Sequence, residues 1–458
     1  MDLLLTIDPA VAGGRRRAIE AALRSAIRAG RLVAGTALPS SRTLAADLGV
    51  ARGTVVDAYD QLAIEGYLDT RQGGRTVVAA LPLVPEAPEP PAPAPPPPID
   101  LRAGAPDLSA FPVAAWTAAT RSILRAGPAD ALDYAPARGR PELRAALAAY
   151  LARARGVVAA PEHVVMGSGI DNLLAVLTRA LAASGRRVVA MEDPCLHFHR
   201  AIVTAAGARV VPAPVDEAGV EVDAVAAAGA GAAVVTPARQ SLLGMTLAPG
   251  RRSALLAWAR ASDGLVVEDD YDGELRYDRQ PIGAVQGLDP ERVLYLGTLS
   301  KSLAPGLRLA WAVVPPAVAA DVDEELGLHS TVSSLDQLVV AELLGSQAFD
   351  RHLRRMRSEY RRRRDRFVAL LGEQAPATWV EGVAAGLHAL VRWPEEAAGE
   401  SDLLAEAAER GIGVTALGPG WHGVPRAEGL VVAYGRPPAH DLERRYQAFA
   451  ALMADLVA

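Results

Sequence analysis

The sequence predicts a multidomain chain with an N-terminal winged helix-turn-helix, a large α/β domain and a smaller C-terminal α+β subdomain. Three observations lead to this prediction. A proline-rich segment interrupts the chain at residues 79–98, three helical patterns and a hairpin pattern precede it, and short apolar strands alternate with helices after it. The 458 residues, of which 50% are hydrophobic, are enough to bury two or three cores.

The proline-rich segment predicts a domain boundary. Ten of the 20 residues from 79 to 98 are proline, and the last four are consecutive. Because proline fixes φ and lacks an N–H donor, such a segment can join neither helix nor sheet. A loop inside one domain is a weak alternative at this length. We therefore divide the chain into residues 1–78, a semi-rigid linker at 79–98, a large domain at 99–320, and a long helix with the small subdomain at 321–458.

The N-terminal part predicts three helices. Helical spacing of apolar residues covers residues 14–29 and about 51–65. A short helix between them can begin at Ser40 or Ser41 as its N-cap and can end at Gly49.

A wing and a recognition helix complete this N-terminal motif. Residues 68–78, with two glycines near their centre, are typical of a hairpin. Arg52 lies in the first turn of the third helix, the part that enters the major groove in helix-turn-helix proteins, where a guanidinium can reach guanine or a phosphate. The residues that we expect to contact DNA are Arg42, Arg52, Thr54, Gly73, Gly74 and Arg75. A protein-docking module is the alternative, but the order in which these residue types occur favours DNA.

The α/β prediction for the large domain rests on short apolar segments that alternate with helices rich in alanine and leucine. Strands are expected at 163–166, 188–191, 234–236, 265–268, 293–296 and 309–314. Helices are expected at 141–154, 171–183 and 251–261. Such alternation is typical of a largely parallel, doubly wound sheet. From about residue 321 to 371 the pattern becomes long and helical.

A single lysine, Lys301, stands among 46 arginines. Arginine can replace lysine in salt bridges and phosphate contacts, but only lysine offers the primary amine that forms a Schiff base. Near it in the sequence, Thr298 and Ser300 carry hydroxyls and Arg308 carries a guanidinium, and these are groups that bind phosphate. Chance retention of one surface lysine is the alternative. A phosphate held beside a reactive amine predicts a site for pyridoxal 5′-phosphate (PLP).

Acidic residues crowd the end of an expected strand. Ligands bind at the carboxyl ends of strands in open α/β sheets, and a pyridinium nitrogen needs a carboxylate partner. Asp269 is the first choice for this partner and Asp270 the second, while Tyr271 can donate to the phenolate oxygen of the cofactor. Alone, this run would be interpreted as a solvated acidic loop. The turn at Gly169 and Ile170, which opens a helix, can offer backbone N–H groups to the phosphate.

The N-terminal motif resembles the GntR-type winged helix. The similarity covers about residues 10–78 and is closest in the stretches LPSSR (38–42) and VARGTVVDAY (50–59). It implies the DNA contacts named above. Many GntR proteins have a basic residue where this chain has Val56, so the resemblance implies one base contact fewer.

The chain as a whole resembles the MocR/GabR subfamily of GntR-type transcriptional regulators, in which a winged helix-turn-helix is fused to a fold-type-I aminotransferase-like domain. The motifs that resemble this subfamily are YAPARG (134–139), EDDYDGELRY (268–277) and GTLSK (297–301). The resemblance implies that the counterpart of Tyr134 reaches the phosphate bound by a partner subunit. It also implies a head-to-tail homodimer with swapped DNA-binding domains.

Several positions depart from the family pattern, among them Leu242, which stands where the family has a proline. Leu196 stands where an aromatic residue usually lies beside the cofactor, and Arg239 replaces a histidine. Val431 takes the place of the arginine that binds the substrate carboxylate in aminotransferases, and Ile170 stands where many relatives have threonine. These departures imply that the cofactor anchor is retained while the amino-acid pocket is altered.

These features predict a PLP-dependent, DNA-binding transcriptional regulator. PLP is expected as an aldimine at Lys301, and the domain is expected to sense PLP itself or an amine or amino-acid ligand. The alternative is an active aminotransferase with an accessory DNA-binding domain; we expect at most a weak or partial half-reaction. The expected partners are operator DNA, the small-molecule effector and a second copy of the chain, with no metal ion.

Charge, cysteine content and apolar runs indicate where in the cell the protein is expected. Residues 1–80 carry a net charge of +2 and the remainder −8, so the small domain is the mildly basic one. The only cysteine, Cys195, excludes an intrachain disulfide. Neither an export signal nor a membrane-spanning apolar run is evident, so a cytoplasmic protein without a membrane partner is expected.

Overall fold

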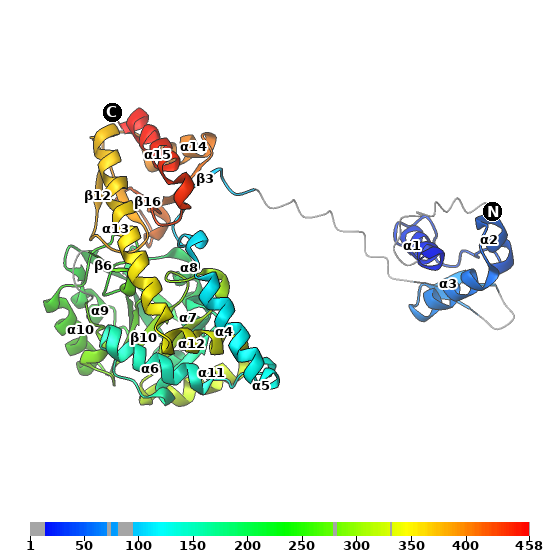
Figure 1. The fold of residues 1–458 in the computed structure, drawn as a ribbon, viewed down its shortest axis with the longest axis horizontal. Helices are drawn as coiled ribbons and strands as arrows, with labels where there is room; N and C mark the ends of the chain where they lie inside the picture. The colour runs from blue at the N-terminus through cyan, green and yellow to red at the C-terminus, as the bar shows by residue number, and fades with distance from the viewer. Residues whose placement is uncertain (1–13, 71–74, 81–94, 278–281, 330–331, 458) are drawn as a thin grey trace. The chain divides into compact units, whose positions relative to one another are not determined.

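The structure, a computed structural model, describes residues 14–70, 75–80, 95–277, 282–329 and 332–457. The chain divides into two compact units, Met1–Pro95 and Pro96–Ala458 (Figure 1). Most of the expected linker, and Gly73 and Gly74 of the expected wing, lie outside the described residues. Among the described helices, none combines the length and apolar character needed to cross a bilayer.

The N-terminal unit has three helices and a two-stranded antiparallel wing. These elements are α1 (Gly14–Arg28), α2 (Ser41–Leu48), α3 (Arg52–Ile64), β1 (Leu68–Asp69) and β2 (Val77–Val78). The N-cap of α2 is Ser40, whose hydroxyl accepts a hydrogen bond from the N–H of Thr43 at 3.1 Å. Gly49 ends α2 in the left-handed conformation, with φ of 62°. One apolar cluster, which includes Ile19, Leu23, Leu44, Val55, Leu62 and Val78, unites the five elements.

An eight-stranded sheet forms the centre of the larger unit. The strand order is β4-β11-β10-β9-β8-β5-β6-β7. The bounds are β4 (Val164–Gly167), β5 (Val188–Asp193), β6 (Arg209–Asp216), β7 (Gly219–Val220), β8 (Ala232–Val235), β9 (Leu265–Asp269), β10 (Val293–Thr298) and β11 (Ala310–Val313). Six strands run in one direction, whereas β11 and β7 are antiparallel to their neighbours, so the sheet is mixed. The sequence did not predict β6 and β7.

Helices cover both faces of this sheet. They are α4 (Val113–Ala126), α5 (Pro128–Leu132), α6 (Pro141–Arg155), α7 (Ile170–Ala183), α8 (His197–Ala205), α9 (Val222–Ala227), α10 (Pro249–Ala261), α11 (Ala319–His329) and α12 (Ser334–Gly345). Successive residues of β10 show the two layers. Leu294 and Leu296 belong to the cluster with α7, α8 and α11, whereas Tyr295 packs with α6 and α12 on the other face. The sheet is thus buried on both sides, as the apolar strand sequences indicate.

The C-terminal part forms a smaller subdomain beyond the long helix α13 (Ala348–Gln374). An antiparallel sheet has the order β12-β13-β16-β15. Its elements and neighbours are β12 (Trp379–Glu381), β13 (Ala389–Arg392), α14 (Glu400–Glu409), β14 (Ile412–Gly413), β15 (Thr415–Ala416), β16 (Leu430–Val432) and α15 (Leu442–Val457). β14 pairs in parallel with β3 (Ile99–Asp100), the first strand after the prolines. The entry of the chain into the larger unit is therefore part of the small subdomain.

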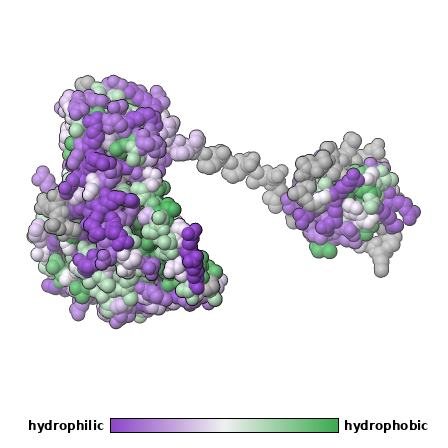
Figure 2. Space-filling model, in the orientation of Figure 1, coloured by the Kyte–Doolittle hydropathy of each residue, from purple (hydrophilic) through white to green (hydrophobic). Residues whose placement is uncertain are grey.

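Helix α13 carries nine arginines between residues 351 and 366. Figure 2 shows a mostly hydrophilic surface over this helix. Several of the arginines attach the helix to its surroundings. Arg363 is buried between the carboxylates of Glu359 and Asp107, and Arg366 pairs with Glu443 on α15.

Candidate functional site

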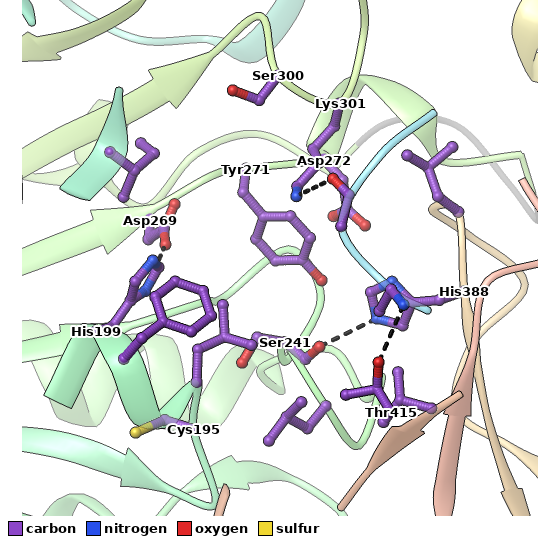
Figure 3. A pocket seen from close by; sticks show the side chains of 18 of the residues that line it. Cys195, His199, Ser241, Asp269, Tyr271, Asp272, Ser300, Lys301, His388 and Thr415 are labelled. Carbon is purple, nitrogen blue, oxygen red and sulfur yellow. Dashed lines mark hydrogen bonds and ion pairs between the residues drawn. The ribbon is translucent and has the colours of Figure 1, made fainter. Parts of the chain in front are cut away.

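A cavity of about 280 Å³ lies where the carboxyl ends of the parallel strands meet the small subdomain (Figure 3). Residues that follow β4, β5, β9 and β10 line it, as expected for ligand sites in open α/β sheets. The lining includes Ile170, Asp171, Leu196, Asp269, Tyr271, Asp272, Thr298, Ser300, Lys301 and Arg308 from the large domain. Leu387, His388, Thr415, Ala416 and Val431 from the small subdomain and Ala103 and Gly104 also line it.

The two adjacent carboxylates at the end of β9 have different surroundings. Asp269 lines the cavity, and its Oδ1 atom is buried without a hydrogen-bond partner. Burial raises the pKa of Asp269 to about 6, although nearby His199, whose Nδ1 lies 3.9 Å from Oδ2, opposes the shift. Asp270 instead accepts two hydrogen bonds from Arg155, at 2.7 and 3.0 Å, and one from the hydroxyl of Tyr295 at 2.7 Å. Of the two, Asp269 has the carboxylate oxygen that is still open to a donor.

Lys301 follows β10 and turns its side chain into the cavity (Figure 3). Its Nζ donates to the carbonyl of Gly104 at 2.5 Å. Burial lowers the pKa of Lys301 below its usual value, while the carboxylates of Asp272 and Asp269 oppose this shift. A lowered pKa raises the fraction of neutral amine, which is the nucleophilic form.

A cluster of hydrogen-bond donors lies next to Lys301. The hydroxyl of Thr298 accepts the N–H of Ser300 at 3.1 Å, so both hydroxyls lie together at the end of β10. The guanidinium of Arg308 packs against Gly169 in the turn before α7, and a Cβ at Gly169 would lie only 2.7 Å from Nη2 of Arg308. The first N–H groups of α7, two hydroxyls and a guanidinium are groups that bind phosphate.

Arg239 lies behind this cavity and does not line it. Its Nη1 donates to the hydroxyl of Tyr271 at 2.9 Å and lies 3.2 Å from a carboxylate oxygen of Asp272. Its Nη2 donates to the carbonyl of His388 at 2.7 Å. Burial lowers the pKa of His388 well below its usual value, with Arg239 adding to the shift, so this imidazole is neutral. The guanidinium of Arg239 is therefore already bonded to Tyr271, Asp272 and His388.

The remaining sequence-predicted positions divide into two groups. Ile170, Leu196 and Val431 line the cavity. Tyr134 does not: it is 97% exposed in the described chain. Sequence reasoning missed His199 and the contributions of Gly104, His388 and Thr415. The last three lie on segments that carry no recognisable motif, and only the fold brings them to Lys301.

The DNA-contact candidates lie on the N-terminal unit. Arg42 on α2 and Arg52 at the start of α3 are exposed, and Nε of Arg52 donates to the hydroxyl of Ser41 at 3.4 Å. Thr54 is half-buried in the first turn of α3, and Arg75 is exposed just before β2. The first turns of α2 and α3 thus present their polar side chains together.

Comparison with known proteins identifies both units. Residues 15–78 match the family "Bacterial regulatory proteins, gntR family", and residues 96–420 match "Aminotransferase class I and II". The chain is 33% identical to the HTH-type pyridoxine biosynthesis transcriptional regulator PdxR of Corynebacterium glutamicum, over 92% of this chain and 91% of that protein. It is 34% identical to the probable rhizopine catabolism regulatory protein MocR of Rhizobium meliloti, over 90% of this chain and 88% of that protein. The chain belongs to the MocR-type GntR transcriptional regulators.

The larger unit of this MocR-type regulator has the fold of aminotransferases. An archaeal alanine:glyoxylate aminotransferase matches it with a TM-score of 0.71 and 26% identity, over 78% of this chain and 91% of that one. This fold implies PLP binding, and the cavity fits the cofactor at two points. The unpartnered Oδ1 of Asp269 suits a pyridinium N–H, and Gly169 leaves room for Arg308 beside the α7 N-terminus. The protein is thus a PLP-dependent, aminotransferase-like regulator with a GntR DNA-binding domain.

Proposed function

We propose that the cavity is a ligand sensor whose occupancy changes the affinity of the N-terminal unit for operator DNA. The observation that supports this most is the unpartnered carboxylate oxygen of Asp269 beside Lys301, in a chain that also carries a GntR domain. The effector would be PLP itself or an amine that reacts with bound PLP. The PdxR relative is named for pyridoxine biosynthesis and the MocR relative for rhizopine catabolism.

Each lining group has a proposed role toward PLP. The cofactor supplies an aldehyde that binds amines reversibly and a ring that withdraws electrons. Lys301 would bond covalently to it, Asp269 would hold the pyridinium N–H, and Tyr271 would donate to the phenolate oxygen. The phosphate would be held by Thr298, Ser300, Arg308 and the N–H groups at Gly169 and Ile170.

The proposed assembly is a homodimer. Tyr134 and the apolar side chains of Leu108, Val113 and Leu132 are exposed in the single chain. A second copy would cover such side chains, and Tyr134 would then reach the phosphate bound by its partner. The DNA contacts would come from Arg42, Arg52, Thr54 and Arg75, with Gly73 and Gly74 at the wing.

A short stretch of backbone supports communication between cavity and linker. The chain leaves the prolines at Pro98, forms β3 against β14, and reaches the cavity at Gly104, whose carbonyl accepts from Lys301. A ligand that engages Lys301 would release this carbonyl. The released segment is continuous with the linker to the DNA-binding unit.

The test compares DNA affinity with and without the cofactor. The probe is a duplex that the full chain selects from random sequence, and fluorescence anisotropy gives Kd. We expect saturating PLP to change Kd at least fivefold for the wild-type chain and to leave the Lys301→Ala variant unchanged. Equal affinities of the wild-type chain with and without PLP, and with and without added amines, would contradict the sensor.

The alternative, a working aminotransferase with an accessory DNA-binding domain, shares Lys301, Asp269 and Arg308. It requires a group that clamps the substrate carboxylate. Apart from Arg308 at the proposed phosphate corner, no arginine lines the cavity among the described residues. Turnover measurements separate the two functions.

A further inference from the structure

The cavity has two chemically different ends. Around Lys301 and Arg308 lie three carboxylates, those of Asp171, Asp269 and Asp272. The opposite wall is mostly apolar: it includes Ala103, Leu196, Leu242, Leu387, Ala416 and Val431, with the polar His388 and Thr415 among them. Leu242 and Val431 belong to one buried cluster with Leu390 and Leu417, and Leu196 packs against it. The apolar wall is therefore part of a packed core and not a chance exposure.

The arginines near the apolar wall have other partners. Arg239 donates to Tyr271 and His388. Arg436 lies 2.8 Å from Asp100, and Arg200 donates to the carbonyl of Gly420 at 2.9 Å.

The polar groups at this end are neutral. His388 is neutral because burial lowers its pKa, and the hydroxyl of Thr415 accepts the N–H of Ala103 at 3.1 Å. In the described part of the cavity, no cation at this end is placed to meet a carboxylate.

The charges in the cavity also favour a ligand without a carboxylate. Asp171 and Asp272 already have arginine partners, Arg308 at 3.7 Å and Arg239 at 3.2 Å, whereas Oδ1 of Asp269 has none; the phosphate of PLP would add further negative charge. A ligand ammonium is favoured beside these groups, whereas a second anion is repelled. A carboxylate placed against the leucines would also lose its hydration without gaining a partner.

From this arrangement we infer that the effector is a primary amine with an apolar tail and no carboxylate. The ammonium end lies toward Asp269, Asp272 and Lys301, and the tail lies against Leu196, Leu242 and Val431. The inference rests on the proposed sensor function, because it assigns the ligand class of the same cavity.

A matched pair of ligands tests the inference. 3-Methylbutylamine and L-leucine have the same branched tail and the same amine, and they differ only in the carboxylate. Calorimetric titration of the full-length, PLP-loaded chain gives both dissociation constants. We expect the amine to bind at least tenfold more tightly than leucine. Equal or tighter binding of leucine overturns the inference, as does the absence of binding by both ligands.

Substitutions on the apolar wall provide a second readout. Val431→Arg introduces a cation at the wall and should reverse the order, so that leucine binds more tightly than the amine. Ala416→Arg is the second variant, because Ala416 is half-buried and accepts a longer side chain more easily than buried Val431. Val424→Arg is the matched control, since Val424 is 86% exposed and does not line the cavity. An unchanged order in both wall variants, with PLP retained, overturns the placement of the tail.

The experiments distinguish failure of the proposed function from failure of the ligand class. A chain that retains no PLP overturns the proposed function, and this inference with it. A chain that retains PLP and changes its DNA affinity with leucine but not with 3-methylbutylamine overturns the ligand class alone.

Discussion

Asp269 and Asp270 are adjacent in the sequence, but their side chains point in opposite directions and have different partners. Successive strand side chains point to opposite faces, so one carboxylate reaches the cavity while the other meets Arg155 and Tyr295 on the far side. The sequence ranks Asp269 first but cannot exclude Asp270, because Arg155 lies 115 positions away in the chain. The partner that removes the ambiguity is visible only in the fold.

Asparagine substitutions at the two positions should therefore have different effects. Asp269→Asn removes a charged partner of the pyridinium, which contributes about 1.5–3 kcal/mol, so Kd for PLP should rise roughly 10- to 150-fold. Absorbance of retained PLP after dialysis measures this change. Asp270→Asn is the matched control: it breaks a buried ion pair and should lower the free energy of unfolding by about 3–5 kcal/mol. PLP loss in Asp270→Asn alone, with an unchanged Tm, would reverse the assignment.

Lys301 should carry the cofactor covalently. Because burial lowers its pKa, the neutral amine is available at a lower pH than for a free lysine, so attachment should occur near neutral pH. Borohydride reduction and peptide mapping should place the label on the peptide containing Ser300, Lys301 and Ser302. Lys301→Arg keeps a positive charge but has no primary amine, and should give no labelled peptide. A label found only at the N-terminal amine would remove Lys301 from this role.

At the scale of elements, the sequence predicted those with strong local signals. Ser40 caps α2 and Gly49 ends it, and the buried strands β5, β8, β9 and β10 lie on the expected apolar runs. It missed β6, which contains Pro212 and Pro214, because prolines are unfavourable inside strands and break the pattern.

The small subdomain was harder to predict for a different reason. β14 and β15 are two residues long, too short for the period-two pattern that identifies a strand. β15 brings Thr415 and Ala416 to the cavity, so that side of the site could not be assembled from the sequence. The cofactor end could, since Asp269, Lys301 and Arg308 directly follow or lie near strongly patterned strands.

Helix α3 is expected to contact the DNA bases, and a substitution in its first turn tests this. Arg52→Ala removes the exposed guanidinium at its first turn, and loss of a base contact costs about 1–3 kcal/mol, which raises Kd roughly 5- to 150-fold. Arg31→Ala, an exposed arginine after α1, is the matched control. Anisotropy with the selected duplex measures both, and PLP absorbance should stay unchanged. An affinity of Arg52→Ala within twofold of wild type would exclude Arg52 from recognition.

At the scale of the whole molecule, an aminotransferase fold is joined to a DNA-binding unit. One end of its cavity carries the amine of Lys301, the carboxylate of Asp269 and the guanidinium of Arg308, whereas Leu196, Leu242 and Val431 lie in the opposite wall. A fold alone does not determine function, which depends on the groups at the site. In this chain the two ends of one cavity have different chemistry, and the apolar end offers no cation to an amino-acid carboxylate among the described lining residues.

Sustained transamination of common amino acids should therefore be absent or very slow. The reaction needs the substrate carboxylate clamped so that the Cα–H bond is oriented for proton removal. Arg239 is engaged by Tyr271, Asp272 and His388, and Val431 cannot form a bidentate contact with a carboxylate. Keto-acid production from leucine, alanine, aspartate and glutamate, with 2-oxoglutarate as acceptor, measures turnover, and Lys301→Ala gives the background. Turnover of about 1 per second or more, which is ordinary for enzymes, would show that another group clamps the carboxylate and that the protein works as an aminotransferase.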